Sequence, residues 1–183
     1  MKKIVQREEK VLRKETKEVP VHLIKTLKIK KILKEMSSAL LSQDDGVAIA
    51  APQIGYSLSI FIVSGKIFDK DFLRGKELST ATDSILNKTK KKKYKDLVFI
   101  NPKISKLSRE KEWVPEGCLS VRWLYGKTFR SKKATVTAYD ENGKKFTRGA
   151  SGLLAQIFQH ETDHLKGILF TDHAKEVREE KPS

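Results

Sequence analysis

The sequence predicts an α+β fold, in which antiparallel sheets pack around a central helix. Three observations predict it: an amphipathic helical pattern near the N-terminus, several short apolar or alternating segments after it, and a second helical pattern near the C-terminus. There are no internal repeats. At 183 residues the chain is long enough to bury a core of its own. We therefore expect one domain over residues 1–183, with an insertion at about 65–96.

The first element is an amphipathic helix. Apolar residues recur at helical spacing from His22 to Gln43, and lysines occupy much of the remaining surface. Asp44-Asp45-Gly46 is expected to end this helix, because glycine suits the position after a helix end. The preceding residues, 1–20, are expected to form an extended arm.

The segment Gly46–Gly55 is rich in small residues, so its backbone can approach another group closely. Residues 57–64 contain the apolar run Ile60-Phe61-Ile62-Val63 and are expected to form a strand. Residues 65–96 are polar and lysine-rich, which predicts a solvent-exposed insertion. Strand character resumes at 97–102 and closes at a proline.

Asp140-Glu141-Asn142-Gly143 is a strong turn signal. Apolar and polar residues alternate over 134–139 before it, and strand character resumes over 144–146, so a strand is expected on each side of the turn. Ser151 is then expected to cap a helix that runs from Gly152 to about Lys166 and stops at Gly167. The tail from Asp172 is interpreted as a short charged helix or a frayed end.

Composition narrows the class of protein. Apolar residues make up 38% and charged residues 33% of the chain, and no run approaches the ~20 apolar residues of a membrane span. The basic start lacks an apolar segment after it, so a secretory signal is not expected. The one cysteine excludes an internal disulfide. We expect a cytoplasmic protein without a membrane partner.

The formal net charge is +15, from 38 Lys and Arg against 23 Asp and Glu. This excess creates a field that attracts RNA, ribosomes or acidic surfaces, although it also has a simple role in keeping a protein soluble. Much of it lies in a lysine cluster within 88–95, which no aromatic base-stacking platform accompanies. Electrostatic association with the ribosome is expected, and sequence-specific nucleic-acid binding is not.

The most informative motif is His160-Glu161-Thr162-Asp163-His164. Positions four apart lie on the same face of a helix, so the two imidazoles can hold one metal ion while Glu161 handles protons beside it. The pattern indicates metal-assisted hydrolysis of a carbonyl compound.

A catalytic site of this kind usually has a third protein ligand. The long metalloprotease signature fails, because Phe170 stands where its third histidine belongs. A metalloprotease with a carboxylate ligand remains an alternative, with three eligible residues, Asp172, Glu176 and Glu179. The favoured ligand is Cys118, the only thiol, which lies in Glu116-Gly117-Cys118-Leu119-Ser120.

Three segments, Gly46–Gly55, Glu116–Ser120 and Gln159–His164, resemble the three motifs of the peptide deformylases in order and spacing. The resemblance covers nearly the whole chain apart from residues 65–96. It extends through Ile4-Val5-Gln6, Val11-Leu12-Arg13, Phe99-Ile100-Asn101-Pro102 and the residues that follow His164. It implies a deformylase-like fold, with antiparallel sheets around a metal-binding helix. It also implies removal of the N-formyl group from the initiator methionine of newly synthesised polypeptides, with release of formate.

The resemblance further implies roles for single residues. Cys118, His160 and His164 are the expected metal ligands, and Glu161 is the expected general acid/base for a metal-bound water that attacks the formyl carbon. Two donors, Gln53 and the backbone N–H of Leu119, are expected to receive the formyl oxygen. The resemblance points to Fe(II), while the donor set also suits Zn(II), Ni(II) or Co(II).

Substrate contacts are expected in the same three segments. Leu153, Ile157 and Val47 are placed to line a methionine pocket, and the peptide backbone is expected to add as a strand beside Gly46–Ile49, with Gly117 allowing close approach.

Two positions depart from the family pattern: Ala48 stands where most deformylases carry a glycine, and Arg122 stands where a proline is frequent. A catalytically weak member that acts as a basic ribosome-binding protein is therefore a further alternative.

Overall fold

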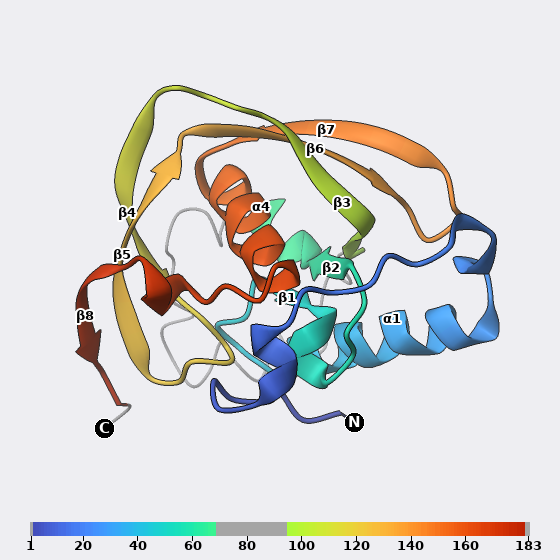
Figure 1. The fold of residues 1–183 in the computed structure, drawn as a ribbon, viewed down its shortest axis with the longest axis horizontal. Helices are drawn as coiled ribbons and strands as arrows, with labels where there is room; N and C mark the ends of the chain where they lie inside the picture. Colours follow the sequence, from blue (N-terminus) through green and yellow to red (C-terminus); the bar gives the residue numbers. More distant parts are fainter. Residues whose placement is uncertain (1, 69–94, 182–183) are drawn as a thin grey trace, which may run out of the picture.

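The computed structural model describes residues 2–68 and 95–181. Within them, two antiparallel sheets and two long helices form the fold, and helix α4 runs through the middle of the molecule (Figure 1). The α+β fold class with antiparallel sheets is confirmed. Most of the expected insertion, 69–94, lies outside the described residues, and the single domain over the whole chain remains a prediction.

The larger sheet has five strands in the order β1-β2-β3-β6-β7, and every neighbouring pair is antiparallel. Its strands are β1 (Ala48–Ala50), β2 (Ile60–Val63), β3 (Leu97–Leu107), β6 (Lys133–Tyr139) and β7 (Lys145–Ser151). Strand β1 is the short edge strand and comes from the small-residue segment. The backbone of that segment therefore lies at a sheet edge, where an added strand can pair.

The smaller sheet has the order β4-β5-β8, with β4 at Lys111–Gly117, β5 at Leu124–Ser131 and β8 at Lys175–Glu179. The prediction of a helix or frayed end after Asp172 was wrong. Strand β8 pairs with β5 through its backbone, and all its side chains are exposed. Charged, exposed side chains suit an edge strand. Because they form no alternating apolar pattern, the sequence does not indicate a strand here.

Helix α1 spans Leu27–Leu41, so it starts later than the expected His22. Thr26 is its N-cap, and the threonine hydroxyl accepts a hydrogen bond from the Ile29 N–H at 3.5 Å. A separate 3-10 turn occupies Val21–Leu23. The expected arm likewise contains a 3-10 turn at Lys10–Arg13. Further 3-10 turns lie at Ala51–Ile54, Gly65–Phe68 and Phe170–Asp172.

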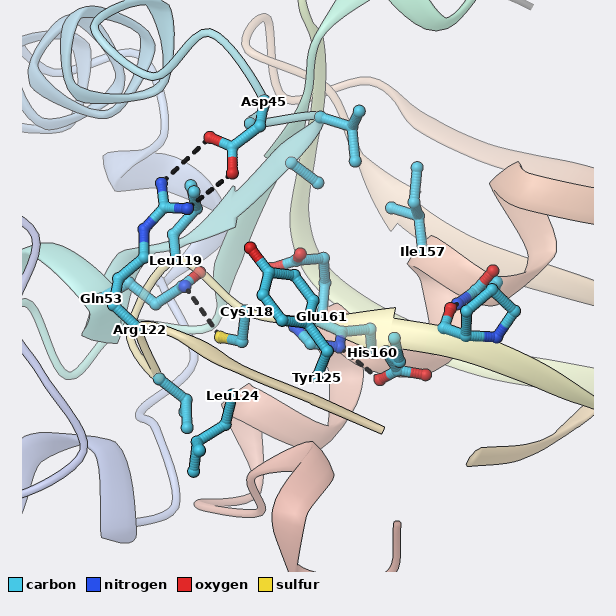
Figure 2. A pocket seen from close by; sticks show the side chains of 18 of the residues that line it. Asp45, Gln53, Cys118, Leu119, Arg122, Leu124, Tyr125, Ile157, His160 and Glu161 are labelled. Atoms are coloured by element: carbon cyan, nitrogen blue, oxygen red, sulfur yellow. Dashed lines mark hydrogen bonds and ion pairs between the residues drawn. The ribbon is translucent and has the colours of Figure 1, made fainter. Parts of the chain in front are cut away.

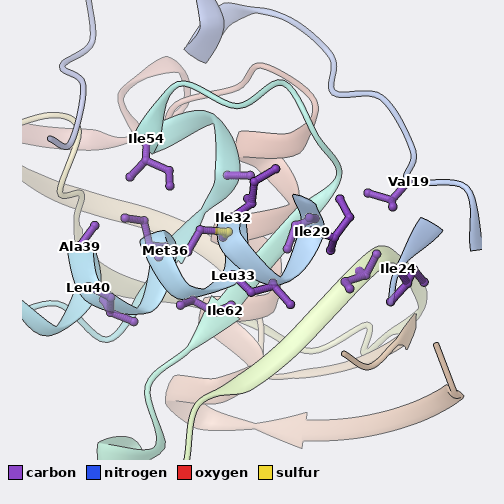
Figure 3. Close-up of a cluster of buried hydrophobic side chains, with 14 of the residues drawn as sticks. Val19, Ile24, Ile29, Ile32, Leu33, Met36, Ala39, Leu40, Ile54 and Ile62 are labelled. Carbon is purple, nitrogen blue, oxygen red and sulfur yellow. The ribbon is translucent and has the colours of Figure 1, made fainter. Parts of the chain in front are cut away.

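Helix α4 spans Gly152–Leu165, as expected. It packs on the five-stranded sheet, where Phe158 of the helix meets Phe99 edge-on and Phe99 stacks on Phe61. Helix α1 forms a second core with β1 and β2, built around Ile32, Leu33 and Met36 (Figure 3). The two cores pack on the two faces of β1, because Ile49 belongs to the α1 core whereas Ala48 and Ala50 belong to the α4 core. This packing positions the functional site between β1, α4 and the smaller sheet.

Candidate metal centre

Helix α4 carries the two histidines side by side. The ring centroids of His160 and His164 lie 4.9 Å apart, as their spacing of four residues requires. Gln159 fixes this part of the helix to the end of β5, because its amide donates to the Ser131 carbonyl and accepts from the Ser131 N–H, both at 2.9 Å. The rings are thus held at a defined position against the smaller sheet.

Cys118 follows β4 directly and meets the histidine pair. Its Sγ lies 3.2 Å from Nε2 of His164, and ligand atoms of Cys118, His160 and His164 all lie within 4.8 Å of one another. Among the described residues, this is the group with metal-ligand geometry. The three carboxylates considered for a metalloprotease are not part of it: Asp172 pairs with Arg13 at 2.6 Å, Glu176 with Lys127 at 2.7 Å and Glu179 with Lys181 at 3.1 Å.

The side chains fit a divalent cation. One sulfur and two ring nitrogens leave room for a further ligand, as catalytic metal sites do. Burial, reinforced by the neighbouring His160, lowers the pKa of His164 well below its usual value, so this ring is in the neutral form that binds metal. In addition, Oε2 of Glu161 is buried and has no hydrogen-bond partner among the described residues. A buried carboxylate oxygen without a partner is expected where a water, substrate or ion is to be held.

A buried network of charges lies behind His160. Oε1 of Glu116 lies 2.5 Å from Nδ1 of His160, and Arg130 donates to both oxygens of the same carboxylate at 2.8 and 3.1 Å. The Thr128 hydroxyl donates to Glu116 as well, and Arg130 continues to Asp163 at 2.6 Å. With Nδ1 engaged by a carboxylate, the Nε2 of His160 carries the lone pair that a metal requires.

Glu116 is ionised in this network. Burial favours its neutral form, but the hydrogen bonds from His160 and Arg130 outweigh burial and hold the pKa of Glu116 far below its usual range. Sequence reasoning did not assign a role to Glu116, Thr128, Arg130 or Asp163. Two of the four stand inside the recognised motifs, whereas Arg130 joins them from a strand through tertiary contact.

Glu161 is 3% exposed, and burial raises the pKa of its carboxyl group to about 7. A group that gains and loses a proton near neutral pH is suited to general acid/base work.

Gln53 enters from the 3-10 turn after β1. Its Oε1 accepts from the Ala50 N–H at 2.7 Å, which leaves the amide nitrogen directed toward Cys118, 3.6 Å from Sγ (Figure 2). The loop with Leu119 is held in place by Gln6, whose amide donates to the Leu119 carbonyl at 3.1 Å. The Gln53 amide therefore lies beside the thiol, and Leu119 lines the same cavity as both of them.

A cavity of about 460 Å³ opens over these groups. Five of the expected substrate contacts line it: Val47, Ala48, Gly117, Leu153 and Ile157. Ile49 does not. Because side chains alternate along a strand, Ile49 points into the core beneath α1 and is fully buried. Lining residues that sequence reasoning did not single out include Gln156, Leu124 and Tyr125.

The two departures from the family pattern lie at the rim of the cavity. Arg122 forms a two-pronged ion pair with Asp45, at 2.5 and 3.0 Å (Figure 2). It also donates to Gln43 at 2.9 Å. Ala48 lies in the extended backbone of β1 and is absent from the described non-glycine residues with positive φ. The methyl group of Ala48 therefore does not require a strained backbone.

A family model described as polypeptide deformylase matches residues 1–180. The chain belongs to the peptide deformylase family. It is 39% identical to peptide deformylase 2 of Clostridium acetobutylicum over 90% of this chain and 89% of that protein. A solved peptide deformylase of Legionella pneumophila is 30% identical, with a TM-score of 0.74 over 96% of this chain and 87% of the other. A peptide deformylase of Acinetobacter baumannii with bound Met-Ala-Ser is 27% identical, with a TM-score of 0.75 over 93% and 96% of the two chains.

The expected family is confirmed, and with it the expected activity. This deformylase is a metal-dependent hydrolase that removes the N-formyl group from newly synthesised peptides. In the part of the chain that the structure describes, no helix combines the length and apolar character needed to cross a membrane.

Proposed function

We propose that this deformylase holds one divalent cation with Cys118, His160 and His164, and that Glu161 is its general acid/base. The observation that carries the proposal is the convergence of the Cys118 sulfur with two imidazoles beside the unpartnered, buried Glu161 oxygen. Cys118, directly after β4, and His160 of α4 are 42 positions apart in the chain. Among the described residues, their group includes no carboxylate of the C-terminal tail.

Glu161 performs the proton transfers of amide hydrolysis. A divalent cation bound in the site makes water a stronger acid and polarises the formyl carbonyl. The Glu161 carboxylate takes the proton of the attacking water and delivers it to the nitrogen of the departing methionine. Such a role typically contributes ~10²–10⁴-fold to the rate.

Gln53 and the backbone N–H of Leu119 receive the formyl oxygen as it gains negative charge. The Gln53 amide is already oriented by its hydrogen bond to Ala50, so little reorganisation is needed when the oxygen arrives. Removal of one such donor typically costs ~10²–10³-fold in rate.

The methionine side chain enters the cavity between Val47, Leu153 and Ile157, and the peptide backbone pairs with the free edge of β1. Recognition through backbone hydrogen bonds suits a substrate class that shares its first residue and little else. The Met-Ala-Ser peptide bound by the Acinetobacter relative is consistent with a site of this kind. Ile49 contributes through its backbone only.

We infer Fe(II) as the working metal, with Zn(II), Ni(II) and Co(II) as functional substitutes. One thiolate and two imidazoles suit all four ions. We also propose a cytoplasmic enzyme that associates electrostatically with the ribosome, because a net charge of +15 attracts RNA-rich surfaces.

The test is a formate-release assay with formyl-Met-Ala-Ser, carried out on protein purified without oxygen and analysed for metal. Glu161→Gln should retain the metal and lose at least ~10²-fold in kcat, while Glu110→Gln, an exposed control, should behave as the parent. An unchanged kcat in Glu161→Gln rules the role of Glu161 out. Cleavage of unformylated peptides that persists in Cys118→Ala would instead select a metalloprotease. Inactivity with full metal loading would select a binding protein.

A further inference from the structure

Two large aromatic side chains face solvent on the smaller sheet. Trp113 of β4 and Phe129 of β5 are directly opposite in the strand register, and their ring centroids lie 5.2 Å apart. Their exposed fractions are 46% and 50%. The residues on either side of Phe129, Thr128 and Arg130, are buried on the opposite face against the metal centre. The aromatic pair therefore belongs to the outer face.

Lysines approach both rings. Nζ of Lys175 lies 5.0 Å from the Trp113 ring centroid, and Nζ of Lys111 lies 5.8 Å from that of Phe129. Within the described part of the chain, neither lysine has an ion-pair partner. The exposed acidic residues of β4 and β8 are each paired with other lysines: Glu112 with Lys132, Glu176 with Lys127 and Glu179 with Lys181. We call Lys111, Trp113, Phe129 and Lys175 the aromatic-basic face.

This combination selects among partners. The carboxylates of an acidic peptide pair with the two lysines, but they do not stack on the rings as nucleobases do. Single-stranded nucleic acid offers both, because bases stack on aromatic side chains while phosphates pair with lysines. The aromatic pair also stabilises the hairpin as a cross-strand pair, but that role does not call for cations beside both rings.

We propose that the aromatic-basic face binds single-stranded RNA without sequence preference. Bases stack on Trp113 and Phe129, and phosphates pair with Lys111 and Lys175. RNA is the nucleic acid chosen because this enzyme acts on newly synthesised peptides. This face is assembled by strand pairing from residues that are separated in the chain.

The face lies close to the cavity along the same two strands. Strands β4 and β5 carry the aromatic pair, and the same strands continue to Pro115, Gly117 and Tyr125, which line the cavity. The enzyme can therefore bind RNA on this face while the residues that contact the peptide stay free for substrate.

The test is fluorescence anisotropy of a labelled oligouridine of about 10 nucleotides, titrated with metal-loaded enzyme. Trp113→Ala and Phe129→Ala should each weaken binding about tenfold or more, and Trp113→Phe should retain most of it. Lys111→Glu with Lys175→Glu should weaken binding and flatten its salt dependence. Lys28→Glu with Lys31→Glu, exposed on α1, is the charge-matched control and should have a smaller effect.

Formate release should be unchanged in Trp113→Ala, which verifies that the variant is folded. Wild-type affinity in both alanine variants would overturn the proposal, as would an equal loss in the α1 control. Displacement of the oligouridine by polyglutamate more readily than by unlabelled RNA would assign the face to an acidic peptide instead. Tighter binding of oligodeoxyuridine would remove RNA as the partner.

Discussion

The carboxylate of Glu116 lies 2.5 Å from Nδ1 of His160 and so determines which nitrogen of that ring is free for a metal. The same carboxylate anchors Arg130, which is only 7% exposed. A single buried acid therefore couples the metal site to the stability of the smaller sheet.

Glu116→Gln should weaken both functions. Loss of a partner that orients a metal-bound histidine typically lowers metal affinity 10–100-fold, and a buried Arg130 without its full counter-charge should cost about 3–5 kcal/mol of stability. Chelator competition and urea unfolding measure the two effects. Glu112→Gln, an exposed residue of the same strand, is the control. Parent-like metal affinity in Glu116→Gln would show that the network serves structure alone.

The pair of Asp45 and Arg122 should give a measurable pH dependence. The hydrogen bond from Arg122 lowers the pKa of Asp45 below its ordinary value of 3.8, while partial burial opposes this. A lowered folded-state pKa means that the stabilisation is complete above the unfolded-state value and disappears as the pH falls through the folded-state value.

The difference in unfolding free energy between parent and Asp45→Asn should therefore be constant above about pH 5 and should shrink below about pH 4. Urea unfolding at a series of pH values measures it. A difference that grows on acidification would contradict the assigned pairing.

Gly117→Ala should damage substrate binding. A methyl group at this position would lie 2.7 Å from Cδ1 of Tyr125, so the ring that lines the cavity must move. The KM for formyl-Met-Ala-Ser is expected to rise with a smaller change in kcat. Gly149→Ala is the matched control in a strand, because its nearest neighbour, Oγ1 of Thr135, is 3.7 Å away. Equal KM values in the two variants would show that Tyr125 adapts freely.

Phe99→Ala should remove much of the stability of the core beneath α4. Phe99 is 1% exposed, stacks on Phe61 at 4.6 Å and meets Phe158 edge-on at 5.1 Å. Truncation of a buried phenylalanine to alanine typically lowers the free energy of unfolding by about 3–5 kcal/mol. Phe68→Ala, at a side chain that is 48% exposed, should change stability by less than about 1 kcal/mol. Guanidinium unfolding of both variants checks this contrast.

The parts of the molecule that could be predicted are those encoded locally. The spacing of His160 and His164 fixes their common face on a helix, and the apolar pattern of residues 152–166 gives the bounds of α4 within one residue. The resemblance to the family motifs then predicted that Cys118, distant in the chain, binds the same metal as the two histidines.

The parts that could not be predicted depend on tertiary contacts. In the sequence, nothing distinguishes Arg130 from the other basic residues. Its contact with Glu116 arises only when β4 and β5 pair. The conformation predicted for the segment that forms β8 was wrong. Its side chains are exposed and mostly charged, and its backbone pairing with β5 decides its conformation. Helix α1 begins at Leu27 because the Thr26 cap, rather than the apolar pattern, sets the first turn.

X-ray absorption at the zinc edge of zinc-loaded protein tests the central claim most directly. We expect one sulfur at about 2.3 Å and two histidine nitrogens at about 2.0–2.1 Å, with the sulfur signal lost in Cys118→Ser. A coordination shell of nitrogen and oxygen alone in the parent protein would contradict the site.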